Sequence, residues 1–501
     1  MEGNVLTYIL AAVSDPSALI MVFAGTFMGL VFGALPGLSA TMAIALLIPM
    51  TFTLEPVAGI GAMLGAYIGG MAGGAVAAIL INIPGTPSAV VTTLDGHPMA
   101  VKGEAAKALG WAAFSSGFGG LISWAILVFL APKLAAVCTS FSSPEYAALA
   151  LFGLTIIASV SGKSMMKGLI AGLIGVLLAM AGIDPIWGDM RFTFGNFNLL
   201  SGVATMPALI GLYSIPQILK GCLEKNNVGK VDVTIKDFVP PFKEIWKRKI
   251  NIIRTSIIGT FIGIVPATGG NIAAFIAYDQ AKRFSKNPEN FGKGEIDGII
   301  ASEAANNSVC GGALIPMLTL GIPGDSPTAV LLGGLMIHGL TPGPAMFVEH
   351  YDIVVGIFTM LLIATILMVL LQMVGVKLFT KVLAVPVNYL SAALVVLALV
   401  GSYALRTNMF DVYLTIGLGI FGYFLSRAEF PVAPAVLGLV LGRMFERELR
   451  TGLRTSQNNP AVFFTRPVSC IIIVISVAVV VWTVVKRQRD KKRNMGEQAL
   501  I

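Results

Sequence analysis

Long apolar runs follow one another along most of the chain, separated by short stretches rich in Gly, Pro and polar residues. About 20 apolar residues are enough for a helix to cross a bilayer. Because the runs lack the period-two alternation of strands, they predict membrane helices. We expect helical segments near residues 17–35, 39–53, 57–81, 106–131, 144–160, 164–182, 199–219, 252–265, 271–284, 297–321, 328–345, 350–375, 386–402, 410–426, 430–445 and 470–485.

The same interruption occurs twice inside these runs. Residues 29–41 read GLVFGALPGLSAT, and residues 259–271 read GTFIGIVPATGGN. Both contain G-x-x-x-G-x-x-P followed by small and polar residues, and Pro36 and Pro266 lie 230 positions apart. Because Pro and Gly break helices, each copy predicts a broken membrane helix.

A second break follows each copy. Gly-Gly-Ala at 73–75 leads to IPGTPSAV at 83–90, and Gly-Gly-Ala at 311–313 leads to IPGDSPTAV at 322–330. A repeated pair of such interruptions is the best sequence indication of a secondary transporter and of its binding site.

The repeated motifs predict an all-α, polytopic membrane protein with about 10–13 transmembrane helices. We expect a first repeat at 1–220, a cytoplasmic linker at 221–251, a second repeat at 252–450, and an anchor helix with a basic cytoplasmic tail at 451–501. Some helices are half-spans or re-entrant hairpins in this interpretation. An odd number of crossings per half would invert one repeat relative to the other and place a site between them.

The composition agrees with a membrane location. Of 501 residues, 56% are hydrophobic and 12% are charged, and the mean hydropathy is +0.84. Soluble proteins carry roughly 25% charged residues. The N-terminus lacks the basic region of a secretory signal, since the first Lys or Arg is Lys102.

The net charge of +8 is concentrated in two places, between Lys220 and Arg254 and after the last apolar run. Basic loops favour the cytoplasmic side of a membrane, so this charge predicts topology rather than nucleic-acid binding. The four Cys and three His are scattered without metal-ligand spacing, so we expect neither a disulfide framework nor a metal site. The basic tail consists of Lys486, Arg487, Arg489, Lys491, Lys492 and Arg493.

The first pair of breaks supplies candidate substrate ligands. A helix N-terminus carries a partial positive charge and free N–H groups that bind carboxylates, and unwound carbonyls suit Na⁺. The alternative for Gly29, Gly33, Gly259 and Gly263 is that they only let helices pack closely. The candidate substrate-binding residues are Pro36, Gly37, Ser39, Thr41, Pro266, Thr268, Gly269, Gly270 and Asn271.

The second pair of breaks is typical of re-entrant hairpin tips and carries further polar groups. Asp325 is the charged residue of this pair and either binds a cation or caps the following helix. Polar residues inside a span are functional candidates. We therefore predict Asn306, Asn307 and Asp325 as cation ligands. Glu303 lies either within the span or at the membrane surface. The second-break candidates are Pro84, Gly85, Thr86, Pro323, Gly324, Asp325 and Ser326.

Catalytic motifs are missing from the sequence. There is no H-E-x-x-H, and Gly162-Lys163-Ser164 lacks the glycine five positions earlier that a phosphate-binding loop requires, since that residue is Ile157. We therefore expect no enzyme, no ATP hydrolysis and no cofactor beyond a coupling Na⁺ or H⁺. Because Lys and Arg are rare within the predicted spans, a carboxylate would be held by helix N-termini, hydroxyls and a co-bound cation.

The motifs at 33–39, 83–87, 263–271 and 322–327 resemble those of the large membrane subunit of bacterial tripartite tricarboxylate transporters. The resemblance runs from Ala18 to about Arg450. It implies a multi-pass permease of the bacterial inner membrane with a cytoplasmic C-terminus. It also implies a small membrane subunit, a periplasmic substrate-binding protein, and uptake of a carboxylate such as citrate driven by Na⁺ or H⁺.

Several alternatives remain open at this point. The same broken helices would suit a passive anion channel, which does not accumulate substrate against a gradient. An intramembrane enzyme would need a nucleophile with a base, or a metal set, at membrane depth. In the transporter interpretation, the two repeats alternate access to the site, and the permease acts either as a single copy or as a homodimer.

The site assignment predicts that Asn271→Ala and Ser39→Ala reduce uptake of labelled citrate while leaving membrane insertion intact. Gly269→Leu should reduce uptake further, because its side chain blocks approach of a ligand to the backbone. Normal transport by both alanine variants would contradict the assignment.

Overall fold

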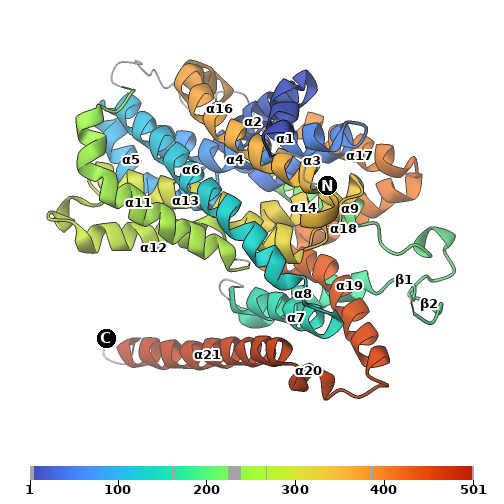
Figure 1. Cartoon of the computed structure of the whole chain (residues 1–501). Helices are drawn as coiled ribbons and strands as arrows, with labels where there is room; N and C mark the ends of the chain where they lie inside the picture. The colour runs from blue at the N-terminus through green and yellow to red at the C-terminus, as the bar shows by residue number, and fades with distance from the viewer. Residues whose placement is uncertain are drawn as a thin grey trace. The chain divides into compact units, whose positions relative to one another are not determined.

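The computed structural model describes residues 5–160, 164–184, 186–223, 238–266, 268–383 and 387–498, and most of them are helical (Figure 1). The helices pack into two units. The first unit is Met1–Ala136 with Met206–Phe424, and the second is Val137–Thr205 with Leu425–Ile501. Among the described residues, the strands are limited to the hairpin of β1 (Gly182–Ile183) and β2 (Met190–Arg191). The predicted all-α class is confirmed.

Among the described residues, five helices are long and apolar enough to cross a membrane, which confirms a polytopic membrane protein. Shorter apolar helices accompany them, and the predicted 10–13 crossings stay a prediction. The five segments are Pro16–Ala34, Pro56–Ile81, Ala105–Cys138, Tyr351–Gly375 and Met409–Arg427.

The first copy of the motif folds as two broken helices. Pro36 follows the end of the first helix, and Ser39 starts the next one by accepting a hydrogen bond from the N–H of Met42. The second break separates a long helix from a short 3₁₀ turn and the helix after it. The elements are α2 (Pro16–Ala34), α3 (Ala40–Thr51), α4 (Pro56–Ile81), η1 (Pro87–Ala89), α5 (Val90–Val101) and α6 (Ala105–Cys138).

The second copy repeats this order of long and short helices. Pro266 again follows a helix end, and Asp325 caps the helix after the second break. In Figure 1, α11, α12 and α13 lie side by side, in agreement with their packing. The elements are α11 (Phe242–Ile264), α12 (Gly269–Phe284), η4 (Pro288–Asn290), α13 (Ile296–Leu320), α14 (Ser326–Ile337), α15 (Met346–Glu349) and α16 (Tyr351–Leu383).

Both copies pack their first helix against their long helix through glycine. A Cβ at Gly29 on α2 would lie 2.5 Å from the carbonyl oxygen of Ala66 on α4. A Cβ at Gly259 on α11 would lie 2.7 Å from Cα of Ala305 on α13 and would also collide with the hydroxyl of Ser308. These glycines therefore allow close helix packing, as one of the sequence alternatives proposed.

The remaining helices of the first unit surround these copies. The helix α1 packs on α16, and α10 and α3 pack on α17. One continuous helical stretch contains a π-helical turn between two α-helical parts. These elements are α1 (Val5–Ser14), α9 (Thr205–Leu209), η3 (Ile210–Ser214), α10 (Ile215–Leu223), α17 (Val387–Arg406) and α18 (Met409–Arg427).

In the second unit, α19 packs on α7 and α8, and α21 packs on α7. The hairpin is tied to α19 by ion pairs of Asp184 with Arg450 and of Arg191 with Glu446. Burial raises the pKa of Asp184, but hydrogen bonds from Arg450 and from two backbone N–H groups outweigh it and lower the pKa to about 2. The unit contains α7 (Ser143–Val160), α8 (Met165–Ala179), η2 (Phe197–Leu199), α19 (Val432–Thr455), α20 (Val462–Thr465) and α21 (Pro467–Gln498).

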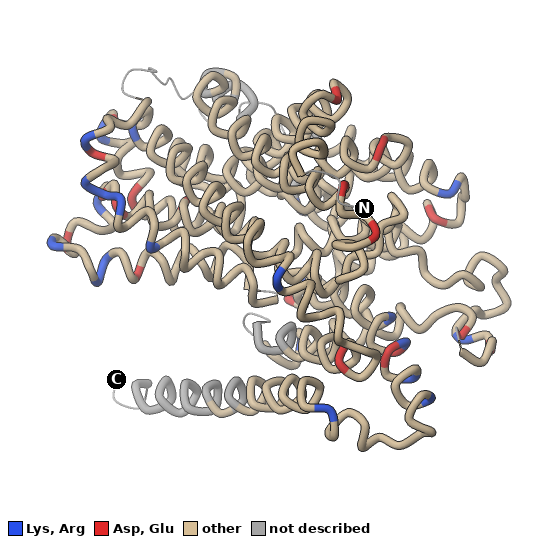
Figure 2. The backbone as a smooth tube through the Cα atoms, in the orientation of Figure 1, with Lys and Arg blue, Asp and Glu red and all other residues tan. Residues whose placement is uncertain are grey.

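Basic residues of the first unit gather at the start of α11 and the end of α12 (Figure 2). Lys102, just after α5, joins them, since its Nζ donates to the carbonyl oxygen of Lys293 at 2.6 Å. Of the predicted linker and the 162–164 loop, residues 224–237 and 161–163 lie outside the described residues. The boundaries of the two sequence repeats stay a prediction.

The packing predicts that Gly259→Ala destabilises the protein, by about 1–3 kcal/mol for a side chain forced into a filled space. The matched control is Gly417→Ala on α18, where a new Cβ meets no atom within 4 Å. This control should change stability little or raise it slightly, because Ala favours a helix over Gly. Thermal unfolding of the purified protein in detergent measures both, and equal melting temperatures would contradict the packing argument.

Candidate functional site

The break between α2 and α3 is closed by Ser39. Its hydroxyl accepts from the N–H of Met42 at 3.2 Å and donates to Oε1 of Gln217 on α10 at 2.8 Å. Gly37 is exposed and has φ of +88°, a conformation that glycine adopts without strain. Pro36 and Thr41 are buried. The polar atoms of this break are thus largely engaged within the protein.

The break between α11 and α12 leaves N–H groups available. The Thr268 hydroxyl lies 2.5 Å from the carbonyl oxygen of Ile262 and 2.7 Å from that of Val265, so it donates a hydrogen bond to the C-terminal end of α11. Gly269 starts α12 with φ of +64°. Among the described residues, no partner is found for the backbone N–H groups at 269–271. Pro266 and Gly270 are buried, and the Asn271 side chain is exposed.

The break after α4 folds back onto its own copy. Gly85 donates its N–H to the carbonyl oxygen of Gly74 at 3.4 Å, and a Cβ at Gly85 would collide with the carbonyl oxygen of Gly33. The hydroxyls of Thr86 and Ser88 are 3.1 Å apart and buried. Pro84 is half-buried. This break therefore lies against the end of α2.

The break after α13 has the same arrangement. A Cβ at Gly324 would lie 2.6 Å from the carbonyl oxygen of Gly263. Asp325 forms a capping box: Oδ1 accepts from the N–H of Thr328 at 2.9 Å, and the Asp325 N–H donates to the Thr328 hydroxyl at 2.9 Å. Pro323 is buried and Ser326 half-buried. Of the two roles considered for Asp325, the structure shows the cap.

Each long helix makes a hydrogen bond to the other copy. Tyr67 on α4 donates its hydroxyl to Oδ2 of Asp325 at 2.5 Å. Asn306 on α13 donates its Nδ2 to the carbonyl oxygen of Met71 at 2.9 Å. Tyr67 and Asn306 are 239 positions apart, as are Thr86 and Asp325. The two contacts differ in their acceptors, which are a side-chain carboxylate on the second break and a backbone carbonyl oxygen within α4.

These contacts bring several breaks to one place, the central cluster. A Cβ at Gly270 would meet Oδ1 of Asn306 and would lie 3.2 Å from Cβ of Ser88, and a Cβ at Gly269 would lie 3.9 Å from Cβ of Asp325. Oδ1 of Asn306 is buried without a partner among the described residues. We define the central cluster as Tyr67, Thr86, Ser88, Gly269, Gly270, Asn306 and Asp325.

A profile of the Tripartite tricarboxylate transporter TctA family matches residues 19–437. The chain belongs to this family. It is also 36% identical over 480 residues, 95% of each chain, to an uncharacterized 52.8 kDa protein in the TAR-I ttuC' 3'region of Agrobacterium vitis. A second relative from that organism, an uncharacterized protein in the TAR-II ttuC' 3'region, is 35% identical over 47% of this chain and 97% of its own. No solved structure matches.

Other predicted residues of this TctA-family chain lie beside the central cluster rather than in it. Ser39 and Thr41 belong to the start of α3, which packs on α4 and α14. Asn307 faces α6 and donates its Nδ2 to the Ser116 hydroxyl at 2.8 Å, whereas Asn306 faces α4. Glu303 is completely buried, so of the two locations considered for it the structure shows an interior one.

Two members of the central cluster were absent from the sequence prediction. Tyr67 is the one hydroxyl-bearing residue of α4, a helix otherwise built from aliphatic residues, glycine, proline and methionine. Ser88 follows the Pro-Gly-Thr-Pro run of the second break. Tyr67 could have been predicted from the sequence, because a polar group inside a span is a functional candidate. Ser88 could be placed only by packing.

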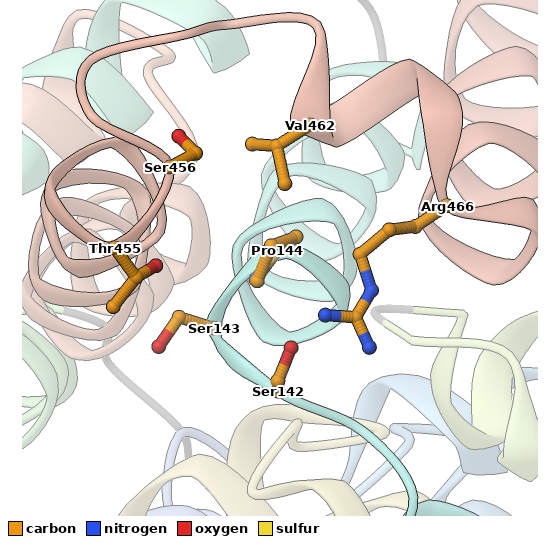
Figure 3. Close-up of a pocket in the computed structure, with 7 residues that line it drawn as sticks. All are labelled: Ser142, Ser143, Pro144, Thr455, Ser456, Val462 and Arg466. Atoms are coloured by element: carbon orange, nitrogen blue, oxygen red, sulfur yellow. The ribbon is translucent and has the colours of Figure 1, made fainter.

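One pocket of about 420 Å³ lies in the second unit (Figure 3). It contains none of the predicted site residues. Its charged residue, Arg466, pairs with Glu145 at 2.7 Å, and Glu145 also accepts from the N–H and hydroxyl of Ser142. The positive charge of this pocket is therefore already balanced. The lining residues are Ser142, Ser143, Pro144, Thr455, Ser456, Val462 and Arg466.

The central cluster predicts that Asn306→Ala lowers uptake about fivefold, since one lost hydrogen bond is worth roughly 1 kcal/mol. The matched control is Thr319→Val on the same helix, whose buried hydroxyl bonds to the carbonyl oxygen of Ile315 within α13. Initial uptake rates of labelled citrate, normalised to the amount of inserted protein, measure the difference. Equal rates for the two variants would remove Asn306 from the site.

Proposed function

We propose that this TctA-family chain is the membrane subunit of a binding-protein-dependent transporter that takes up a carboxylate such as citrate. A gradient of Na⁺ or H⁺ supplies the energy, and the two repeats alternate access to the site. The observation that carries this proposal is the central cluster, where the free N-terminus of α12 meets polar groups of both second breaks.

The substrate anion would be held without a basic side chain. The helices α3, α4, α5, α13 and α14 contain no Lys or Arg. The N–H groups at 269–271 supply positive partial charge where a carboxylate approaches. Pro36, Gly37, Ser39 and Thr41 complete the proposed substrate path from the first copy. The remaining proposed contacts on this path are Pro266, Thr268, Gly269, Gly270 and Asn271.

A coupling Na⁺, if it is the ion used, would bind to oxygen atoms near the same N-terminus. Oδ1 of Asn306 is buried and unpaired among the described residues. Oxygen atoms of Asp325 and Ser88 lie on the neighbouring breaks. Amide, hydroxyl and carboxylate oxygens are hard ligands that suit such a cation. A cation beside the carboxylate would also offset its charge.

Alternating access would break and remake the contacts between copies. Tyr67 with Asp325 and Asn306 with Met71 are hydrogen bonds between the two copies. A movement of one repeat against the other would separate these polar groups. We therefore assign the moving boundary of the transporter to the α4–α13 contact.

The family and the charge pattern support the proposed partners and orientation. A small membrane subunit and a periplasmic substrate-binding protein would complete the complex in the bacterial inner membrane. In this complex the permease would be either a single copy or a homodimer. Under the positive-inside rule, the basic ends of α11 and α12 would lie on the cytoplasmic side (Figure 2). The C-terminal basic tail would lie on that side too.

The proposal predicts accumulation of labelled citrate in proteoliposomes that hold this chain with its small subunit, with binding protein outside. Accumulation should require an inward Na⁺ or H⁺ gradient and should stop when an ionophore dissipates it. Equilibration without accumulation would indicate a passive channel instead. No uptake by a folded complex, beside a working control transporter, would reject citrate as the substrate.

A further inference from the structure

Glu303 is a buried carboxyl group in the middle of α13. Its side chain has 0% exposure. Oε1 accepts a hydrogen bond from the Thr92 hydroxyl on α5, and Oε2 accepts one from the Ser116 hydroxyl on α6 at 3.0 Å. The helix α6 approaches closely here, since a Cβ at Gly119 would collide with the carbonyl oxygen of Ala304. The carboxyl group is thus enclosed by three helices.

No positive charge balances this carboxyl group among the residues that the structure describes. None of their ion pairs includes Glu303. Burying an ionised carboxylate without a cation is costly, and the group takes up a proton instead. By contrast, the buried carboxyls of Glu145, Asp184 and Asp411 each contact an Arg.

Two other buried carboxyls have no cation but are better supplied with donors. Asp95 accepts from the backbone N–H groups at 292, 294 and 295 and from the Tyr278 hydroxyl. Asp325 sits at a helix N-terminus, where it accepts from a backbone N–H and from Tyr67. Backbone N–H donors and a helix N-terminus stabilise the ionised form. Glu303 receives two neutral hydroxyl donors and lies in mid-helix.

The surroundings of Glu303 suit a group that changes its protonation. Ser116 links it to Nδ2 of Asn307 at 2.8 Å, and Thr92 lies 3.0 Å from the Ser302 hydroxyl. Hydroxyls can reverse from donor to acceptor when the carboxyl gains a proton. Oδ1 of Asn307 and the hydroxyl of Ser115 are buried without described partners. These groups can reorganise without any atom having to leave the interior.

The helix α13 carries both this carboxyl group and Asn306 of the central cluster. Asn306 lies three residues further along α13 and contacts Met71 and the Gly270 backbone. One helical turn spans 3.6 residues, so any shift of α13 at Glu303 moves Asn306 with it. A shift of α13 caused by protonation on its α5 and α6 side can therefore reach the site on its α4 and α12 side.

We propose that Glu303 binds and releases the proton that is coupled to transport. This inference rests on the proposed transport function and names its coupling ion. The carboxylate gains H⁺ from the outer side to become a neutral carboxylic acid, and it returns H⁺ to the inner side after the substrate has left. One O–H bond forms and the same bond breaks, so no other reactant is needed.

Other titratable groups on the helices packed against α13 have partners of their own or lie at helix ends. Arg248 on α11 pairs with Glu244 and Asp297, and Arg254 bonds to Asn251. Lys107 at the start of α6 pairs with Glu104. Several more of these groups have partners, namely His97 with the carbonyl oxygen of Ile79, Tyr278 with Asp95, Tyr67 with Asp325, Asp279 with Arg283, and Lys249 over the Trp246 ring. Groups at or near helix ends are Lys243 and Lys247 on α11, Lys133 and Cys138 on α6, Lys282 on α12 and His338 at the C-cap of α14, whereas Cys310 is buried within α13.

Infrared spectroscopy of the purified full-length chain tests the proton directly and needs no substrate. We expect the C=O band of a buried protonated carboxyl at neutral pH, lost in Glu303→Gln and retained in the control Asp325→Asn. Thr92→Val removes a donor to the ionised form, so the band should persist to higher pH, by about one pH unit. If Glu303→Gln leaves the band unchanged, or if wild type lacks it, the proposal is wrong.

Sodium is tested by repeating the spectra with NaCl in place of choline chloride. Loss of the band on adding Na⁺ would show that Na⁺ occupies this carboxyl and would overturn the proton assignment. An unchanged band supports it.

Transport gives a second and separable readout. In proteoliposomes with the partner proteins, Glu303→Gln should reduce the accumulation of labelled citrate driven by a pH gradient at least tenfold. The variant should still exchange internal for external citrate. Loss of both in a folded variant would indicate a structural role and contradict the proposal. If wild type does not transport citrate, the substrate assignment fails, while the infrared result still decides the role of Glu303.

Discussion

The structure depends on one constraint, which is that a helix broken inside a membrane exposes backbone N–H and C=O groups that water cannot reach. Each break meets this constraint with groups from its own neighbourhood. The Thr268 hydroxyl serves carbonyl oxygens of α11, Ser39 accepts from the start of α3, and Asp325 closes a capping box on α14. Like the start of η1, the start of α12 has no side-chain cap, and its first N–H groups have no partner among the described residues. A ligand is the natural partner for that end.

Close packing by glycine makes this arrangement possible. Gly29 and Gly259 bring the first helix of each copy against its long helix, and Gly85 and Gly324 bring the second break against the carbonyl end of the first helix. Within a membrane, small residues allow such backbone approach where the hydrophobic effect supplies little attraction between helices. The long helices α4 and α13 are then close enough for Tyr67 and Asn306 to reach the other copy.

The buried carboxyl groups divide by the donors that surround them. Asp95 and Asp325 are supported by backbone N–H groups, which favour the charged form. Glu303 is supported by two hydroxyls and lies away from a helix end. The three groups therefore differ in the kind of donor around them and not in burial, since all three are nearly inaccessible to solvent.

The sequence by itself determined the helical class and the places where helices break. Proline lacks an N–H and glycine weakens a helix, so these signals act locally and need no knowledge of packing. The cap at Asp325 was one of two roles predicted for that residue, because capping depends on a short stretch of chain. The tertiary structure decided which of these residues meet. Asn306 and Asn307 are neighbours in sequence, yet they face α4 and α6, because successive helical residues point about 100° apart. The positions of Ser88 beside Gly270 and of Glu303 between Thr92 and Ser116 depend on how helices distant in the chain rotate and approach, which no local pattern encodes.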